Sequence, residues 1–185
     1  SVNKEHVGLL GTDYTVTDSL YRIARIYRGK NWNPGMRSPL SGPGIDIKEG
    51  EYLLSVNGQM LTTDVNIYSL FDQTAGKQTV IRVNTSPSME GSREVTVVPV
   101  ASESALRQRE WMESNRKKVD SLSDGKLAYV WLPNTGTTGY SNFNRYYFAQ
   151  KYKSGAIIDE RFNGGGLVAD YIIDLLDREL VGYFS

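Results

Sequence analysis

The stretch that most constrains the fold lies near the end of the chain, where a short apolar run is followed by three glycines and an amphipathic segment. Ala156, Ile157 and Ile158 form the apolar run. Such a run is typical of a parallel strand that is buried on both faces. After the glycines, apolar residues recur at the spacing of a helix, at Val168, Ile172, Leu175 and Leu176. The pattern predicts a strand, a glycine turn and a helix.

The glycine turn at residues 164–166 has three possible interpretations. It is a tight connection without chemistry, or a dinucleotide loop, because Gly164, Gly166 and Ala169 satisfy Gly-x-Gly-x-x-Ala. The third interpretation is an oxyanion hole for acyl transfer, since glycines expose the backbone and N–H groups at a helix N-terminus are free to bind anions. The acidic residue of a dinucleotide fold, expected about 20 residues later, would lie at or beyond the last residue. Spacing alone does not separate the three.

Composition excludes several classes of function. Lys and Arg together number 21, and so do Asp and Glu, so the balance lacks the basic footprint of a general nucleic-acid or anionic-membrane binder. The absence of cysteine excludes disulfides and cysteine-based zinc sites, and a single histidine, His6, argues against a histidine-rich metal site. No apolar run approaches the length of a membrane span, and no signal peptide is visible. We therefore expect no metal, no cofactor, no nucleic acid and no membrane, and the compartment stays open.

The first hundred residues predict five strands and one helix. The strands are expected at residues 7–16, 20–27, 52–56, 78–84 and 94–100. In the second strand, strict alternation places Ile23 and Ile26 on opposite faces. Thr63 or Asp64 is expected to cap a helix that runs to about residue 74. These elements describe a small, partly open β-barrel with a capping helix.

The remaining residues predict a helix and then an α/β segment. Residues 102–121 have apolar positions at Leu106, Trp111, Met112 and Val119, and their many charges suggest a linker helix. A strand at 126–133 and a helix from Tyr140 or Ser141 to about residue 153 precede the stretch described first. This order is typical of a parallel β-α-β unit. We expect three regions, at 1–101, 102–125 and 126–185.

The order of elements, with the segments at residues 44–46, 49–59 and 75–77, resembles a PDZ domain in the permuted form found in bacterial proteases. The resemblance implies that a loop offers backbone N–H groups to a peptide C-terminal carboxylate, and that the peptide lies against the helix. The matching residues are Gly8, Leu9, Leu10 and Gly11 in the loop and Val65, Tyr68 or Phe71 on the helix. A PDZ-like domain that binds nothing is the alternative.

Across the whole chain, the segments at residues 109–116, 129–133 and 159–166 together with the PDZ-like region resemble the tricorn protease family. The resemblance implies a parent serine endopeptidase that acts on peptides or unfolded chains. A glycine of the turn would supply a backbone oxyanion donor, by position Gly166, with Gly165 next. The nucleophile and the base would lie elsewhere in the parent, so this chain, with an incomplete core domain, would be inactive alone. We expect the incomplete half either to lean on the PDZ-like region or to pair its open edge with another copy in a homo-oligomer. The alternative is a non-catalytic peptide-binding scaffold.

Overall fold

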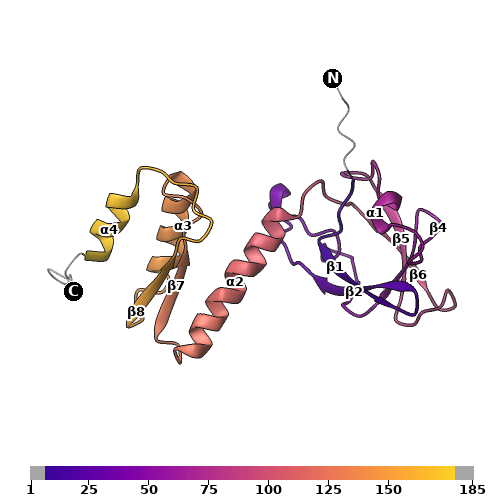
Figure 1. Ribbon diagram of the computed structural model, residues 1–185, viewed down its shortest axis with the longest axis horizontal. Coiled ribbons are helices and arrows are strands. Elements are labelled where there is room, and N and C mark those ends of the chain that lie inside the picture. The colour runs from indigo at the N-terminus through magenta and orange to yellow at the C-terminus, as the bar shows by residue number, and fades with distance from the viewer. Residues whose placement is uncertain (1–6, 178–185) are drawn as a thin grey trace, which may run out of the picture. The chain divides into compact units, whose positions relative to one another are not determined.

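The computed structural model describes residues 7–177, and His6 lies outside this range. The chain forms two compact units, Ser1–Glu110 and Trp111–Ser185. The division falls inside a helix, α2, which spans Ser104–Leu122 (Figure 1). The domain boundary near residue 101 remains a prediction.

The first unit is built on an antiparallel sheet with strand order β1-β2-β3-β5-β6, in which β4 pairs with β3. Its strands are β1 (Thr12–Thr17), β2 (Leu20–Ile26), β3 (Tyr52–Val56), β4 (Gln59–Met60), β5 (Thr79–Asn84) and β6 (Arg93–Val97). Outside these strands, the N–H groups of Leu9 and Val100 each donate to the other's carbonyl, at 2.8 and 2.9 Å. The chain before β1 is therefore paired with the chain after β6, and the expected mixed α/β fold with an antiparallel sheet is confirmed.

The hairpin of β1 and β2 contains a bulge. Asp13 pairs with Arg25 and Tyr14 pairs with Ile23, so Ala24 has no partner in the register. Ile23 and Ile26 are both buried. The expectation that they face opposite ways is wrong, because the extra residue of a bulge interrupts the alternation of side chains.

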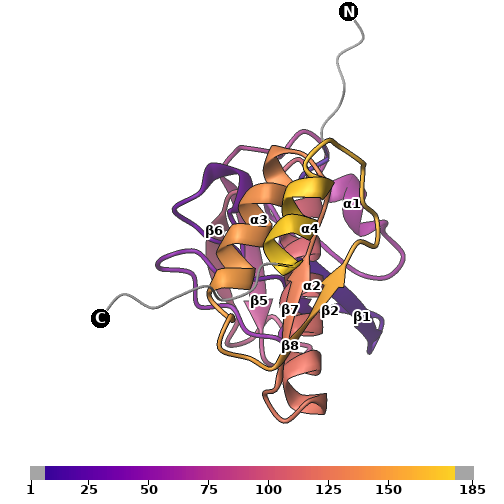
Figure 2. The ribbon, with the colours of Figure 1, turned by 90° about the vertical axis from the view of Figure 1, so that its left-hand side faces the viewer.

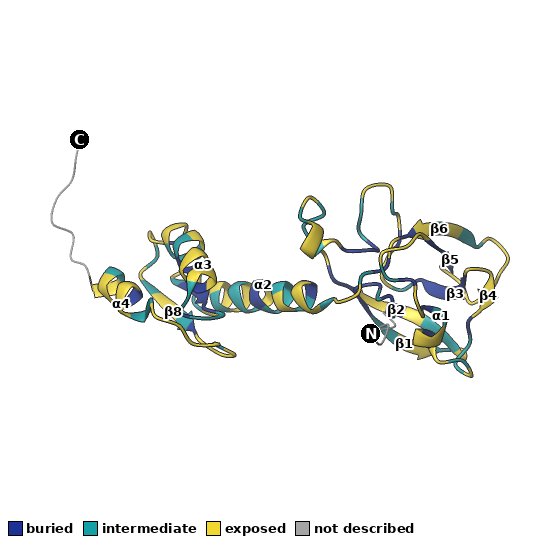
Figure 3. Ribbon diagram, turned by 90° about the horizontal axis from the view of Figure 1, so that it is seen from above, coloured by how far each residue is buried: buried dark blue, intermediate teal, exposed yellow. Residues whose placement is uncertain are grey.

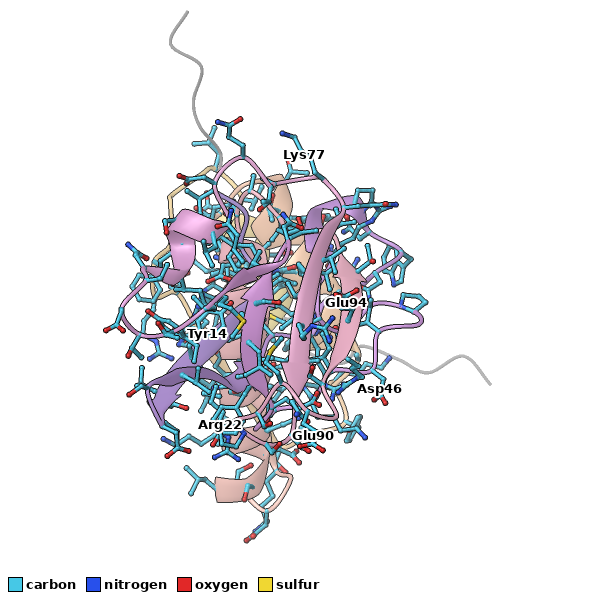
Figure 4. The ribbon with its side chains drawn as sticks, turned by 90° about the vertical axis from the view of Figure 1, so that its right-hand side faces the viewer. Tyr14, Arg22, Asp46, Lys77, Glu90 and Glu94 are labelled. Atoms are coloured by element: carbon cyan, nitrogen blue, oxygen red, sulfur yellow. The ribbon has the colours of Figure 1, made fainter. Side chains whose placement is uncertain are left out.

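The core of the first unit lies beneath β3, which is buried along its whole length (Figure 3). Thirteen buried apolar side chains form this core: Leu10, Ile23, Ile26, Leu40, Ile47, Leu53, Val56, Leu61, Ile67, Phe71, Ile81, Val83 and Val97. The charged side chains labelled in Figure 4, Arg22, Asp46, Lys77, Glu90 and Glu94, are all exposed. Burial of these thirteen apolar side chains stabilises the unit.

The helix of the first unit, α1, is a single turn at Ile67–Leu70, shorter than the predicted helix to residue 74. Asn66 caps it, with Oδ1 accepting from the N–H of Tyr68 at 3.0 Å, so the expected cap at Thr63 or Asp64 is also wrong. The carbonyl of Phe71 accepts from the N–H of Gly8 at 2.8 Å. This carbonyl therefore accepts from a distant part of the chain, and the helix does not continue past it. One further helical turn, the 3-10 helix Pro34–Met36, lies between β2 and β3.

The second unit contains a parallel pair of strands, as the sequence predicts. β7 (Leu127–Trp131) pairs with β8 (Gly155–Asp159), and α3 (Thr137–Phe148) connects them. α3 begins before the expected Tyr140 or Ser141, because the side chain of Asn134 accepts from the N–H groups of Gly136 and Gly139 at 2.9 and 3.0 Å. The last helix is α4 (Ala169–Asp177).

The side chains of β7 and of Leu132, which directly follows it, alternate between two apolar clusters. Val130 and Leu132 pack with Phe143 of α3 and Ile172 of α4, so both helices cover the same face of the sheet (Figure 2). Tyr129 and Trp131 form the second cluster, which includes two residues of α2, Trp111 and Met112. This alternation is what a strand between two layers requires.

The apolar run of β8 is not buried on both faces, which corrects the prediction. Ile157 is 41% exposed, and Ala156 is exposed as well. Among residues 7–177, β8 pairs with β7 alone, so it is an edge strand with an open face. The sequence pattern of a buried central strand is present, but the described residues supply no second neighbour.

Candidate functional site

The turn that leads into the glycines is held by a buried carboxylate at the end of β8. Asp159 is 7% exposed, and its Oδ1 accepts from the backbone N–H of Arg161 at 3.0 Å. The guanidinium Nε of Arg161 lies 2.9 and 3.0 Å from the two carboxylate oxygens, and Nη2 lies 2.5 Å from Oδ2. Tyr129 of β7 donates its hydroxyl to the same Oδ2 at 2.7 Å. Asp159 therefore anchors the beginning of the turn.

These contacts keep Asp159 ionised and Tyr129 neutral. The hydrogen-bonded guanidinium of Arg161, aided by the Tyr129 hydroxyl, outweighs burial and holds the pKa of Asp159 well below its ordinary value. Burial, together with the hydrogen bond to Asp159, raises the pKa of Tyr129 to about 12. At neutral pH the cluster thus consists of a carboxylate, a guanidinium and a neutral phenol, and the one negative charge is balanced by the one positive charge.

The glycine turn is tied to the chain segment that follows β7. The N–H of Gly164 donates to the carbonyl of Pro133 at 3.0 Å, and the N–H of Thr135 donates to the carbonyl of Gly165 at 2.9 Å. The N–H of Val168 in turn donates to the carbonyl of Thr135 at 2.8 Å. Bonds on both sides of Gly166 therefore fix its backbone in place.

The N–H groups of the glycines differ in availability. Gly164 donates to Pro133, and Gly165 donates to the side-chain oxygen of Asn163 at 2.6 Å. The N–H of Gly166 has no hydrogen-bond partner within the part of the chain that the structure describes, and Gly166 is exposed. Of the two expected oxyanion donors, Gly166 therefore presents a free N–H to solvent, whereas the N–H of Gly165 is already bonded to Asn163.

Position 166 requires glycine. Its φ is +147°, and a Cβ built there would lie 2.2 Å from the carbonyl carbon and oxygen of Thr135. Gly165 also has a positive φ, +81°, but a Cβ there would meet nothing within 4 Å. The close approach of Gly166 to Thr135 is thus a packing requirement in addition to a conformational one.

The glycines do not form the first turn of the following helix. α4 begins at Ala169, and the bond from Val168 to Thr135 holds the intervening backbone outside the helix. A dinucleotide loop places its pyrophosphate on the N-terminus of the helix that the glycines open. The geometry does not match that interpretation, and it leaves the N–H of Gly166 as a fixed donor that can stabilise a developing negative charge on an oxygen.

The second expected site, the loop of Gly8, Leu9, Leu10 and Gly11, is largely engaged with its own unit. The N–H of Gly8 donates to Phe71, and that of Leu9 donates to Val100, both at 2.8 Å. The N–H groups of Leu10 and Gly11 have no backbone partner among residues 7–177, although both residues are buried. Two of the four N–H groups therefore have no backbone acceptor within the described residues and could donate to a bound carboxylate.

A small cavity lies beside this loop. It has a volume of about 10 Å³, the space of one water molecule, and it is lined by Gly8, Leu9, Leu10, Thr12, Tyr14, Tyr68, Phe71 and Glu103. Five of the seven expected peptide-binding residues are thus brought together. Val65 and Gly11 do not line the cavity; the carbonyl of Val65 instead accepts from the hydroxyl of Tyr21 at 3.1 Å.

Glu103 gives this cavity an acidic wall that the sequence did not reveal. Its carboxylate accepts from the Nε of Arg107 at 2.7 Å, and Arg107 also pairs with Asp13 at 2.8 Å. Burial, with the nearby Tyr68 and Glu103, raises the pKa of Tyr14, labelled in Figure 4, so it stays a neutral phenol. A peptide carboxylate entering here would approach a like charge.

Sequence reasoning also missed the aromatic support of the glycine turn. Trp111 lies beside Arg161 and Phe162, and Trp131 donates its indole N–H to the carbonyl of Arg161 at 3.0 Å. The sequence pattern places Trp111 only in the apolar stripe of a linker helix. The spacing Asp-x-Arg, at residues 159 and 161, was the available signal for a local ion pair.

Neither a metal-binding cluster nor a membrane-spanning helix is present in residues 7–177. No group of three or more His, Cys, Asp or Glu side chains is placed so that it could hold a metal ion. No helix in the same residues has the length and apolar character that a membrane span needs.

Comparison with known proteins gives matches over nearly the whole chain. A family model described as the tricorn protease PDZ domain matches residues 8–102. A putative tricorn-like protease C-terminal subunit from Sulfurisphaera tokodaii is 34% identical over 179 residues, which cover 96% of this chain and 20% of that protein. The tricorn protease of Thermoplasma acidophilum is 31% identical over 176 residues, covering 95% of this chain and 16% of that protein.

The fold matches as well. A crystal structure of the tricorn protease superposes with a TM-score of 0.83 at 30% identity, covering 96% of this chain and 17% of that chain. This chain therefore spans about a fifth or less of the length of the relatives that it matches.

Proposed function

This chain belongs to the tricorn protease family, and from that premise we propose that it is part of a serine endopeptidase that hydrolyses peptides or unfolded chains. In this proposal residues 1–101 form a permuted PDZ-like β-barrel, 102–125 a linker, and 126–185 the beginning of the protease core. The single observation that carries the catalytic part is the unpartnered N–H of Gly166, fixed by bonds on both sides of it.

The chemistry assigned to Gly166 follows from where charge develops in acyl transfer. When a serine hydroxyl attacks a peptide carbonyl, the carbonyl oxygen becomes negatively charged in the transition state. A donor that is already fixed in place stabilises this oxygen without reorganisation, and removal of one such donor costs ~3 kcal/mol of barrier. The serine and its general base would come from other parts of the parent chain, as would the second donor. Peptide and the remainder of the parent chain are therefore the expected partners.

The PDZ-like unit is proposed to bind peptide or to regulate access to the catalytic core. The supporting observation is that Gly8, Leu9, Leu10, Tyr68 and Phe71 line one cavity. A second function, a peptide-binding scaffold without catalysis, is favoured by the same observation. The two proposals differ in what they require of Gly166, because a scaffold has no use for a free N–H there.

Serine-directed labelling tests the catalytic proposal. A parent chain that extends beyond residue 185 should react covalently with a fluorophosphonate at a serine downstream of Gly166, and the label should abolish hydrolysis of a disordered protein substrate. The 185-residue chain should neither react nor hydrolyse. Two outcomes would contradict the serine mechanism. One is hydrolysis by the parent that persists after labelling, and the other is hydrolysis that a chelator abolishes instead.

A further inference from the structure

The residue before Asn163 adopts a conformation that needs an explanation. Phe162 has a φ of +63°, in the left-handed region that side chains other than glycine rarely adopt. Phe162 is 83% exposed, so burial in the core does not hold it there. Strained backbone of this kind persists where the surrounding structure over-determines it, and it gathers at functional sites. The contacts around Phe162 therefore show what fixes the turn.

Those contacts converge on one side chain of α2. The ring of Phe162 meets the indole of Trp111 edge-on, with the centroids 5.9 Å apart. The guanidinium of Arg161 lies 5.0 Å from the centroid of the same indole. Tryptophan is the aromatic side chain that attracts a cation most strongly, and edge-to-face packing is favourable between rings. Trp111 therefore contacts two successive residues of the turn.

Trp111 is itself held in place by β7. Its indole packs edge-on against that of Trp131, at 5.6 Å between centroids, and the indole N–H of Trp131 donates to the carbonyl of Arg161 at 3.0 Å. The two tryptophans and Asp159 thus contact Arg161 through its side chain and its backbone. The residue after Phe162, Asn163, then accepts from the N–H of Gly165.

We propose that Trp111 is a positioning residue for the glycine turn: by clamping Arg161 and Phe162, it fixes the backbone that presents the free N–H of Gly166. The inference rests on the proposed function for its catalytic meaning, but the clamp itself is a property of this chain. The ring contacts of Trp111 are with Trp131, Phe162 and Arg161, so it acts on Gly166 through the turn.

Amide hydrogen exchange of the 185-residue chain tests the clamp directly. The N–H of Gly164, bonded to Pro133, reports on the docked turn, and the N–H of Gly139, bonded to Asn134, reports on the rest of the second unit. In Trp111→Leu we expect exchange at Gly164 to accelerate about tenfold or more, with Gly139 unchanged. Trp111→Phe keeps an aromatic ring and should lie close to the unsubstituted chain.

Trp32→Leu serves as the matched control, because Trp32 is 80% exposed, belongs to the first unit and also lies near a cation, Lys30. It should leave both glycines unchanged. Unchanged exchange at Gly164 in Trp111→Leu would overturn the proposal. Equal acceleration at Gly164 and Gly139 would overturn it too, because it would show that Trp111 supports the unit as a whole.

A second measurement separates the clamp from the proposed function. In the parent protease, Trp111→Leu should lower kcat about tenfold and leave KM nearly unchanged, since a displaced donor weakens transition-state binding alone. If exchange at Gly164 accelerates but kcat does not change, the clamp stands and the assignment of Gly166 to the oxyanion fails. A rise in KM at constant kcat would contradict the positioning role.

Discussion

Two glycine-containing loops in this chain, one in each unit, were expected to offer backbone N–H groups to a carboxyl or carbonyl oxygen, and the structure treats them differently. In the loop of residues 8–11, two of the four N–H groups are already bonded within the unit. In the turn of residues 164–166, the last N–H is exposed and has no partner among residues 7–177, while the N–H groups of Gly164 and Gly165 before it are bonded. A run of glycines therefore shows where the backbone is unusual, and the hydrogen-bond partners decide which N–H is available.

The reasons for glycine also differ between the loops. At Gly8, a Cβ would lie 2.1 Å from Oγ1 of Thr74 and 2.6 Å from Cβ of Pro99, so glycine is needed for packing within the unit. At Gly166 the obstacle is the backbone of Thr135, which belongs to the same candidate site. The close approach at Gly166 places an N–H donor, whereas the close approach at Gly8 fills the interior.

The largest effect is expected from a comparison of Gly166→Ala with Gly165→Ala. The new methyl group at 166 collides with Thr135 and displaces the free donor, so kcat of the parent protease should fall about 10²-fold or more. At 165 the methyl group meets open space, and the positive φ alone should cost about 1 kcal/mol of folding free energy, with kcat changed by less than about threefold. Steady-state kinetics and thermal unfolding measure the two effects.

The control is built into the pair, because both positions have positive φ and differ in the space around the added carbon. Equal losses of kcat at 165 and 166 would mean that the turn tolerates no side chain at all. The distinction between an engaged and a free N–H would then have no catalytic meaning.

An intermediate effect is expected at the anchor of the glycine turn. Arg161, aided by Tyr129, holds the pKa of Asp159 below its ordinary value. Ionised Asp159 therefore stabilises the fold above the unfolded-state pKa of about 3.9, and this contribution is lost as pH falls through the folded-state pKa. Asp159→Asn should therefore lower the free energy of unfolding by about 1 kcal/mol at neutral pH, after allowance for solvent around the exposed guanidinium. The difference from the unsubstituted chain should stay constant from about pH 5 to 8.

Below about pH 4 the free energies of unfolding of the two chains should begin to converge. The unsubstituted chain progressively loses the contribution of ionised Asp159, which Asp159→Asn lacks at every pH. Asp120→Asn is the matched control, since the pKa of Asp120 is also lowered, by its pair with Lys153, at an exposed site away from the turn. Chemical denaturation at several pH values measures the difference. A gap between the unsubstituted chain and Asp159→Asn that widens in acid would contradict the sign of this linkage.

The sequence predicted the arrangement of elements better than the details of either loop. Periodicity located the strands, the parallel pair and α2, because burial of one or both faces imposes a repeating pattern. It failed where long-range bonds intervene: the bond from Gly8 to Phe71 ends α1 early, and the unpaired Ala24 moves Ile26 into the core. The engagement of Gly165 by Asn163 and the clamp of Trp111 on Phe162 depend on three-dimensional neighbours that spacing does not encode.

The same limit explains the loop of residues 8–11. The resemblance to a PDZ domain identified five residues that do line one cavity, but it gave no indication of the carboxylate of Glu103. Glu103 lies outside the region that carried the resemblance, at the start of what was expected to be a linker. Its position in the cavity depends on Arg107, one helical turn later, which pairs with both Glu103 and Asp13.

The smallest expected effect tests whether the loop of residues 8–11 can bind a carboxylate at all, or is only prevented from doing so by the charge of Glu103. Glu103→Gln removes the like charge from the cavity while keeping the shape of the side chain, so a peptide with a free C-terminal carboxylate should bind about three- to tenfold more tightly, ~1 kcal/mol at a partly exposed site. Glu110→Gln is the matched control, because Glu110 lies on α2, which begins directly after Glu103, pairs with Arg25 and does not line the cavity. Titrations with free and amidated peptides measure the gain, which should vanish on amidation. If Glu103→Gln binds no free carboxylate, or binds amidated peptide equally well, the N–H groups of Leu10 and Gly11 do not capture a carboxylate, and the two loops differ in kind.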